Sequence, residues 1–412
     1  MAGMTEHAGG SGGRLGLRDI VGLDERYYAN AFGPRTPICF TEGRGMHLWD
    51  TEGRRYLDFF GGVAVNAVGH CHEKVVAAIA AQASRLMHVS NHYYIEGQAL
   101  LAERLCAITS MGRAFIGNSG AEANEAAFKL ARMYWHKKGR PERNEIISLR
   151  GSFHGRTMST LAATGQDAFH APFKSLIRGY HYCPINDADA FGSMASSNPN
   201  VAAAIVEPVQ GEGGVHPLED GYLKKVRGIC DEAGILLIFD EIQTGMGRTG
   251  RMLGHEHYGV KPDVVTLAKA LGGGFPIGAM CATEEAATGF GPGDHGTTYG
   301  GGPLACAAAL AVIDVIVGEG LVANSAAMGS YLIAELNRAL AGSPGVTAIR
   351  GLGLMVGIEL AERDSSDVVA SMLKRGYVVG KAGSRVTRLL PPLIVTRREI
   401  DGLVGALAEE LG

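Results

Sequence analysis

Short, uninterrupted apolar runs occur in the middle of the chain at residues 201–206 and 235–239, and a similar strand-like run with one threonine follows at residues 264–267. A strand of a parallel sheet that is covered by helices on both faces has this composition, whereas a strand with one wet face alternates apolar and polar residues. Residues 221–233 lie between two of these runs and are interpreted as the crossover helix of a βαβ unit. We therefore predict an α/β fold built on a parallel sheet.

Further elements are predicted on either side of this sheet. Residues 49–60 place apolar positions around an Asp-Thr-Glu-Gly turn, a pattern that is typical of a β-hairpin. Helices are predicted over residues 73–86, 305–317 and 326–340, and a strand over residues 353–360. The composition after the second of these helices indicates a smaller α+β unit.

Two of the predicted strands lead into residues with catalytic potential. Asp240 directly follows the run 235–239, and Lys269 follows the run 264–267 and precedes three glycines. Open α/β sheets bind ligands at the carboxyl ends of their strands. A lysine amine in apolar surroundings loses basicity and becomes a nucleophile that forms a Schiff base with an aldehyde. The pair favours pyridoxal phosphate, with Asp240 at the pyridinium nitrogen and Lys269 at the aldehyde. Taken singly, Asp240 is better explained as a helix cap and Lys269 as a solvated side chain, and only the pair with its surrounding sequence favours the cofactor.

Residues 115–132 contain a second candidate site, at the start of a predicted helix. Apolar or small residues recur with helical spacing at Ala123, Ala127, Leu130 and Tyr134. Ser119 and Glu122 have the spacing of a capping box. The free amides of Ser119, Gly120 and Ala121, together with the helix dipole, make an anion site. An ordinary helix start is the simpler alternative.

Composition narrows the class of protein. The 412 residues are 46% hydrophobic and 19% charged, as in a globular enzyme, and length alone would allow two or three domains. A net charge of −4 offers no basic field for nucleic acid or an anionic membrane, so neither is expected as a partner. The apolar segment 304–317 is interrupted by Asp314 and is too short to span a bilayer.

Cysteine and histidine usage indicates a reduced compartment and no metal centre. The seven cysteines are scattered and contain no Cys-x-x-Cys pair, which is typical of a cytoplasmic protein with reduced thiols. His70 and His72 have an H-x-H spacing without an accompanying acidic or cysteine cluster, so a metal site is disfavoured. Residues 1–13 are rich in glycine and lack an apolar core, so we expect a disordered tail and not a signal peptide.

The segments 239–250 and 267–278, which contain Asp240 and Lys269, closely resemble class III aminotransferases, the pyridoxal-phosphate ω-aminotransferase group. Within that family the nearest likeness is to enzymes that act on N-acetylornithine. The resemblance begins near Pro34 and implies an aspartate-aminotransferase-like, fold type I large domain with a smaller α+β domain. It implies the following division: a disordered tail over 1–19, an N-terminal segment over 20–70 that packs with the small domain, a large cofactor domain over 71–310, and a small domain over 311–412.

The resemblance also implies the residues of the site. The cofactor-binding residues would be Ser119, Gly120, Ala121, Phe153, Glu207, Asp240, Gln243, Lys269 and Thr298, with Lys269 and Asp240 also catalytic. Phe153 would stack on the pyridine ring, Glu207 would support the site, and Gln243 would bind the ring hydroxyl. Thr298 would reach the phosphate of the neighbouring subunit, which implies a homodimer. The substrate-binding residues would be Arg156, Glu212 and Arg388.

The implied reaction moves the terminal amine of N-acetylornithine to 2-oxoglutarate by a ping-pong mechanism. Arg156 and Arg388 are planar forks suited to carboxylates, and Glu212 pairs with an active-site arginine in relatives and moves as substrates exchange. A structural ion pair is the alternative for Arg156. His92 stands in a segment that resembles the substrate entrance, where leucine is more usual.

Other donors and other activities remain open. Ornithine, succinylornithine and 4-aminobutyrate are alternative amino donors. An aminomutase or racemase would share the lysine and the aspartate, but it would need no second oxo-acid and therefore no pair of arginines. A regulatory cofactor-binding protein would not need Lys269. A dinucleotide-binding protein is disfavoured because no Gly-x-Gly-x-x-Gly segment follows a predicted strand.

Overall fold

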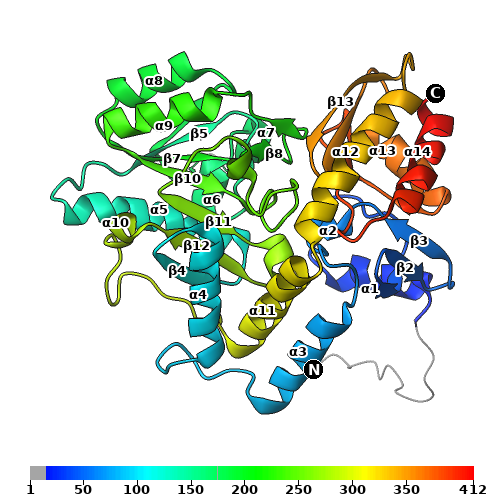
Figure 1. Cartoon of the computed structure of the whole chain (residues 1–412), viewed down its shortest axis with the longest axis horizontal. Coiled ribbons are helices and arrows are strands. Elements are labelled where there is room, and N and C mark those ends of the chain that lie inside the picture. Colours follow the sequence, from blue (N-terminus) through cyan, green and yellow to red (C-terminus); the bar gives the residue numbers. More distant parts are fainter. Residues whose placement is uncertain (1–14, 174) are drawn as a thin grey trace.

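The computed structural model describes residues 15–173 and 175–412. Its centre is a seven-stranded sheet with the order β4-β12-β11-β10-β7-β5-β6 (Figure 1). The strands are β4 (Arg113–Gly117), β5 (Glu145–Leu149), β6 (Tyr180–Cys183), β7 (Val201–Val206), β10 (Leu236–Asp240), β11 (Val264–Leu267) and β12 (Gly278–Ala282). Strand β10 runs parallel to both β7 and β11, which confirms the predicted α/β fold. The sequence pattern did not predict β12, which lies antiparallel between β11 and β4.

Both faces of the central strands are covered, which explains their uninterrupted apolar composition. Leu237 and Phe239 of β10 pack in one cluster with residues of α8 (Ala188–Ser197) and α9 (Tyr222–Ala233). Ile238, on the opposite face, packs with residues of α5 (Gly120–Lys137). In Figure 1 the sheet accordingly lies between α8 and α9 on one side and α5 on the other. Alternate residues of a strand point to opposite faces, so both sets must be apolar.

The N-terminal strands pair with a C-terminal strand. The hairpin predicted over residues 49–60 is formed by β2 (His47–Asp50) and β3 (Arg55–Asp58), which continue a sheet from β1 (Phe40–Arg44). Strand β3 pairs in parallel with β15 (Tyr377–Val378). The N-terminal strands are therefore tied to the C-terminal part of the chain.

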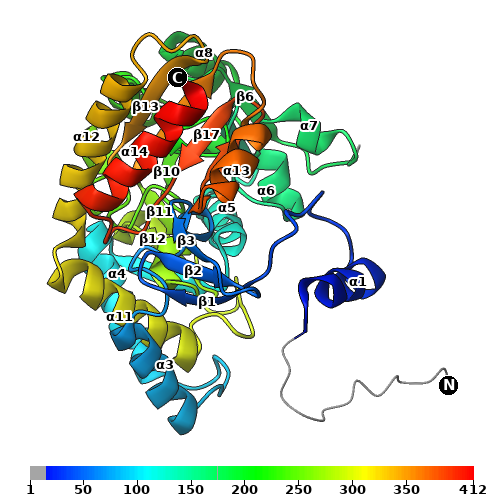
Figure 2. The same cartoon turned by 90° about the vertical axis from the view of Figure 1, so that its right-hand side faces the viewer.

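Helix α1 (Leu17–Tyr27) precedes these strands and has no buried residue, and Figure 2 shows it standing away from the rest of the molecule. Residues 1–14 of the tail predicted over residues 1–19 lie outside the described residues, and α1 begins within the remainder of that range.

The C-terminal part is a second layered unit beside the large sheet. Its sheet has the order β13-β14-β17-β16, formed by β13 (Val346–Leu352), β14 (Met355–Leu360), β17 (Val386–Leu389) and β16 (Gly380–Ala382). Helices α12 (Leu321–Ala339), α13 (Ser365–Lys374) and α14 (Arg397–Leu411) pack with this unit. In Figure 1 it stands next to the N-terminal strands, and α11 (Pro303–Gly318) leads into it from the large sheet.

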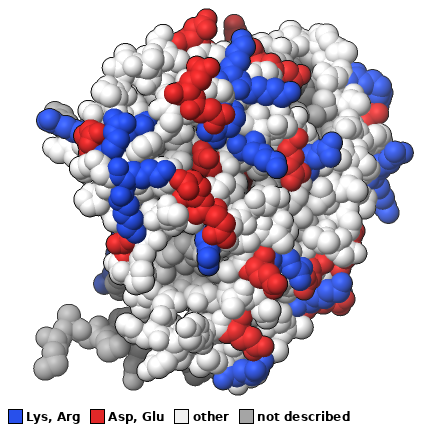
Figure 3. Space-filling view, turned by 60° about the vertical axis from the view of Figure 1, so that its left-hand side comes forward, with Lys and Arg blue, Asp and Glu red and all other residues white. Residues whose placement is uncertain are grey.

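The remaining elements are two longer helices, α3 and α4, several short helices and a small two-stranded ribbon. They are α2 (Gly61–Ala64), α3 (Glu73–Arg85), α4 (Glu96–Thr109), α6 (Met158–Ala163), α7 (Asp167–His170), α10 (Glu284–Ala287), η1 (Gly254–His257), η2 (Lys269–Gly272), β8 (Val209–Gln210) and β9 (His216–Pro217). Acidic and basic side chains are interspersed on the face drawn in Figure 3. Among the described residues no single helix is long and apolar enough to cross a membrane, and only α11 and α12 taken together, with a bend of 63° between them, pass by length and composition.

Candidate active site

A cavity of about 370 Å³ opens at the carboxyl ends of the central strands. Three elements deliver acidic or basic groups to it: Asp240 ends β10, Glu207 follows β7, and Lys269 follows β11. The residues predicted for the site that line this cavity are Ser119, Gly120, Ala121, Phe153, Glu207, Glu212, Asp240, Gln243 and Lys269. The structure therefore brings together side chains that are up to 150 residues apart in the sequence, as expected where parallel strands end at one edge.

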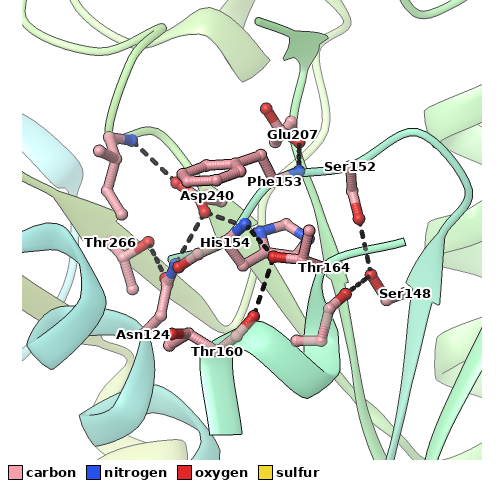
Figure 4. A network of polar contacts seen from close by, with 12 residues as sticks. Asn124, Ser148, Ser152, Phe153, His154, Thr160, Thr164, Glu207, Asp240 and Thr266 are labelled. Atoms are coloured by element: carbon pink, nitrogen blue, oxygen red, sulfur yellow. Dashed lines mark hydrogen bonds and ion pairs between the residues drawn. The ribbon is translucent and has the colours of Figure 1, made fainter. Parts of the chain in front are cut away.

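Asp240 is the centre of a buried polar network (Figure 4). The side chain is only 4% exposed. Its Oδ2 accepts hydrogen bonds from Asn124 Nδ2 and from His154 Nδ1, each at 2.8 Å, and its Oδ1 accepts one from the amide of Ile242 at 3.1 Å. Thr266 Oγ1 in turn donates to Asn124 Oδ1 at 2.8 Å. Buried polar groups require such partners, and this set fixes the orientation of the carboxylate.

Asn124 and His154 are site residues that the sequence interpretation missed. Asn124 lies on the buried face of α5 between apolar residues, and a buried amide must find hydrogen-bond partners. The position of Asn124 on the apolar face of the predicted helix was the signal that could have identified it, because burying its amide without a partner would cost free energy. His154 lies beside Phe153 in a segment that had been singled out for its aromatic and arginine residues. Its Nε2 is buried and has no hydrogen-bond partner among the described residues.

Lys269 is held in a strained backbone conformation. Its φ is 43°, a left-handed value that is uncommon for residues other than glycine and that clusters at functional sites. No hydrogen bond or ion pair to its Nζ occurs within residues 15–173 and 175–412. Burial lowers the pKa of the Lys269 amine below its ordinary value, although the Glu212 and Asp240 carboxylates oppose the shift. An amine in this setting is a readily deprotonated nucleophile and proton carrier.

The N-terminus of α5 forms one wall of the cavity. Ser119 caps the helix, because its Oγ accepts a hydrogen bond from the amide of Glu122 at 3.2 Å. Glu122 Oε2 accepts hydrogen bonds from the amide of Asn118 at 2.6 Å and from Ser119 Oγ at 3.3 Å, but not from the backbone amide of Ser119, so the backbone half of the predicted capping box is displaced by one position. A Cβ on Gly120 would lie 2.7 Å from Ile242 Cδ1, so only glycine fits there. The amide of Glu122 is thus occupied, whereas the amides of Gly120 and Ala121 have no intrahelical acceptor and are free for an anion.

Glu207 and Phe153 form another wall. Glu207 Oε1 accepts from the amide of Phe153 at 2.8 Å, and its Oε2 accepts from the amide of Gly211 at 3.2 Å. Burial raises the pKa of Glu207 to about 7, with a further contribution from Asp240 and an opposing one from His154. Glu207 therefore fastens the segment that carries Phe153 to the end of β7.

Arg388, on the C-terminal sheet, does not itself line the cavity but bonds to two residues that do, Glu212 and Gln243. It lies on β17 and is only 2% exposed. Its Nη1 donates to Glu212 Oε1 at 2.7 Å and to Gln243 Oε1 at 3.3 Å. Burial raises the pKa of Glu212, but the Arg388 guanidinium outweighs that effect and holds the pKa below its ordinary value. The buried guanidinium is thus neutralised by a carboxylate on a separate loop.

Besides Arg388, two further predicted site residues, Arg156 and Thr298, do not line the cavity. Arg156 is exposed, with its guanidinium carbon 3.9 Å from the ring centre of Phe169 and 5.5 Å from that of Phe153. Thr298 is also exposed, while the preceding Thr297 lies beside the cavity, with its Oγ1 3.2 Å from Asn118 Nδ2. Within one chain, therefore, Arg156 lies next to Gly155 of the cavity wall, and both Arg156 and Thr298 are exposed outside it.

Comparison with known proteins identifies the family. Residues 27–411 match the family described as Aminotransferase class-III. The chain is 48% identical over 391 residues to an acetylornithine aminotransferase from Methanocaldococcus jannaschii, which covers 94% of this chain and 97% of that protein. Its fold is similar to that of the ornithine aminotransferase from Toxoplasma gondii, with a TM-score of 0.92 and 32% identity over 97% of this chain and 95% of the other.

A second structure of the Toxoplasma gondii enzyme, crystallised with oxidised glutathione, has partial occupancy of PLP at its active site. It matches with a TM-score of 0.92 and 32% identity, over 96% of this chain and 94% of the other. These likenesses confirm the fold type I architecture that the sequence segments around Asp240 and Lys269 implied. The family match and the near-complete coverage of the relatives lead to one conclusion: this chain belongs to the class III aminotransferases.

Proposed function

We propose that this enzyme transfers the terminal amine of N-acetylornithine to 2-oxoglutarate, with pyridoxal 5′-phosphate as its cofactor. The observation that carries the proposal is the Glu212–Arg388 ion pair, which places a neutralised guanidinium beside the lysine-bearing cavity. A site of this kind can present a carboxylate-binding group to one substrate and conceal it from another. The similarity to acetylornithine aminotransferases over nearly the whole chain supports the same donor.

The residues of the cavity fit the cofactor. The free amides of Gly120 and Ala121 at the start of α5 suit a phosphate, and Gly120 packs closely against Ile242, another residue that lines the cavity. Phe153 would lie against the ring, Asp240 would face the ring nitrogen, and Gln243 would bind the ring hydroxyl. When bound, the cofactor supplies an aldehyde that takes up the amino group and a ring that withdraws electrons from the substrate carbon.

The protein side chains manage charge and protons. Lys269 Nζ accepts a proton from the reacting substrate carbon and returns it, a role that suits an amine whose pKa burial has lowered. Asp240 contributes a fixed negative charge, and His154 and Asn124 prevent it from turning away. Glu207 keeps Phe153 in place through the Phe153 amide. Each of these tasks is positioning or proton transfer by a group already oriented in the free protein.

Arg156 and Arg388 would bind the two substrates in opposite orientations, each through a different carboxylate contact. No carboxylate among the described residues pairs with Arg156, which favours a substrate carboxylate over a structural ion pair as its partner. Arg156 would bind the distant α-carboxylate of the ω-amine donor while Glu212 neutralises Arg388. Glutamate reacts through its α-amine, so its α-carboxylate would take the place of Glu212 on Arg388.

The amino donor is tested by comparing N-acetylornithine, succinylornithine, ornithine, 4-aminobutyrate and lysine with 2-oxoglutarate as acceptor. We expect N-acetylornithine to have the highest kcat/KM, because acylation removes the α-ammonium charge and leaves only the terminal amine to react. The products are identified by mass spectrometry. A preference of tenfold or more for an unacylated donor, about 1.4 kcal/mol, would reject the acetylornithine assignment and leave the aminotransferase chemistry standing.

The exposed loop surface supports a homodimer. Large apolar side chains are exposed on two loops: Leu86 (44%), Met87 (63%), Tyr93 (68%), Tyr94 (107%) and Tyr299 (69%). The loops adjoin each other, because Asn91 Nδ2 donates to the carbonyl oxygens of Thr297 and Gly300, each at 3.0 Å. Clustered exposed apolar groups mark interaction surfaces. A second copy of the chain docked here would bring Thr298 to the neighbouring site.

A hybrid experiment tests this shared site. Lys269→Ala chains lack the catalytic amine, and Thr298→Ala chains lack the hydroxyl that the partner needs, so each homodimer should have reduced activity. In a hybrid, one of the two sites has both its own Lys269 and the partner's intact loop, and activity should recover towards half the wild-type value. Two affinity tags would isolate the hybrid after subunit exchange. No recovery in an isolated hybrid would contradict the shared site.

A further inference from the structure

Arg350 and Arg388 lie on one row of the C-terminal sheet. Strand pairing places Arg350 of β13 opposite Gly357 of β14, and Gly357 opposite Arg388 of β17. Residues that are directly opposite across antiparallel strands project to the same face. Two arginines two strands apart therefore face the same neighbour, and the residue between them has no side chain.

That neighbour is the loop 211–215, which joins β8 to β9 and carries Glu212. Arg388 binds the Glu212 carboxylate, as described above, and Arg350 binds the loop backbone. Arg350 Nη2 donates to the carbonyl oxygen of Gly214 at 2.7 Å, and its Nε donates to the carbonyl oxygens of Gly214 and Val215 at 3.1 and 3.0 Å. Glu359 pairs with Arg350 Nη1 and balances its charge. The Arg350 guanidinium thus binds two successive carbonyls, two and three residues after Glu212.

The backbone conformation of the loop 211–215 requires stabilising contacts of this kind. Val215 has a φ of 54°, a left-handed value that is a genuine outlier for a β-branched residue. Strained positions of this kind persist only where the surroundings over-determine them. The Val215 side chain is completely buried against Gly357, where an added Cβ would approach Val215 Cβ to 2.9 Å. Arg350 and Gly357 together hold Val215 in place and thereby set the position of the loop.

We infer that Arg350 is a positioning residue for substrate discrimination: by holding the loop 211–215, it keeps Glu212 over Arg388 while the ω-amine donor is bound. The inference rests on the proposed function, because it needs two substrates that use Arg388 differently. With the loop anchored, the Glu212 side chain alone turns aside when a dicarboxylate enters. Without Arg350, the Glu212 carboxylate would be paired with Arg388 for a smaller fraction of the time.

The expected effect differs between the two half-reactions. An ω-amine donor brings no carboxylate to Arg388, so it would meet an uncompensated buried guanidinium, and its reaction would slow. Glutamate supplies its own carboxylate and would no longer compete with Glu212, so its reaction would be unchanged or faster. A general loss of folding would instead slow both half-reactions together.

The test compares Arg350→Met with wild type in single-turnover half-reactions, using N-acetylornithine and glutamate separately. We expect the ratio of the rate with N-acetylornithine to the rate with glutamate to fall tenfold or more. Arg350→Lys replaces the planar guanidinium by a single ammonium group, which can still donate hydrogen bonds to the loop but lacks the planar geometry, and it should give an intermediate rate ratio. Arg363→Met is the matched control, because Arg363 also pairs with a glutamate of this unit, Glu410, but touches no part of the loop, and its ratio should equal that of wild type.

A double-mutant cycle with Glu212→Gln separates positioning from structure. If Arg350 acts through Glu212, adding Arg350→Met to Glu212→Gln should change the ratio less than twofold, because the group being positioned is already lost. If the effects of the two substitutions on this rate ratio multiply in the double variant, the inference is overturned.

Hydrogen exchange of the peptide 209–217 in the holoenzyme gives a readout that does not need the substrate assignment. The loop amides should exchange faster in Arg350→Met and not in Arg363→Met, and unchanged exchange would also overturn it. If N-acetylornithine proves to be no substrate while exchange accelerates, the proposed function fails and the anchoring role stands.

Discussion

Lys269→Ala should reduce aminotransferase turnover by about 10⁴-fold or more, since one amine supplies both the nucleophile and the proton carrier. The fold should survive the change. Alanine tolerates the left-handed backbone no worse than lysine does, and the half-buried Lys269 amine forms no hydrogen bond among the described residues, so its removal leaves no partner unsatisfied. We therefore expect the thermal unfolding midpoint of the cofactor-free variant to be no lower than that of wild type. Steady-state assays with the best amino donor and 2-oxoglutarate measure the loss.

Borohydride reduction provides an independent check of the same residue. Reduction of the wild-type holoenzyme should leave a pyridoxyl group on the peptide that contains Lys269, and peptide mapping by mass spectrometry would locate it. Lys261→Ala is the matched control, because Lys261 is an exposed lysine that precedes the same strand, β11. Its turnover should stay within about twofold of wild type. A pyridoxyl group on a different lysine would contradict the assignment.

Asp240→Asn should retain the cofactor and lose most of its turnover. The neutral amide cannot hold a proton on the ring nitrogen by charge, and its NH₂ would face either the two donors from Asn124 and His154 or the amide of Ile242. Losing a charge-assisted contact of this kind costs on the order of 2–4 kcal/mol, which corresponds to a loss of about 30-fold to 1000-fold in kcat. Cofactor content is measured by absorbance, and kcat by the steady-state assay.

Asp263→Asn is the control for this second prediction. Asp263 also accepts partly buried hydrogen bonds, from Arg227 Nη1 at 2.8 Å and from the amide of Leu237 at 2.7 Å, but it directly precedes β11, at the opposite end of that strand from Lys269. Its replacement should lower the free energy of unfolding and leave kcat within about threefold of wild type. Near-normal turnover in Asp240→Asn would show that Asp240 has another role.

Much of the active site was readable from the sequence because its signals are local. The apolar runs before Asp240 and Lys269 identified strands, and strand ends are where such folds bind ligands. Ser119 marked the start of α5 through a capping pattern that spans only four residues. The family resemblance came from the same continuous segments, and the match over residues 27–411 confirmed it. Signals of this kind depend on neighbours along the chain, so they survive without a structure.

The tertiary structure decided the contacts between segments that are distant in the sequence. Strand β12 runs antiparallel between two elements that the sequence did not connect, because strand order depends on how helices cover the sheet. Asn124 became a partner of Asp240 only when α5 packed across the strand ends. Arg350 and Arg388 are 38 positions apart, and nothing local shows that they share a row. Register across β13, β14 and β17 placed both against the loop of Glu212, since strand pairing is set by backbone hydrogen bonds and burial between remote segments.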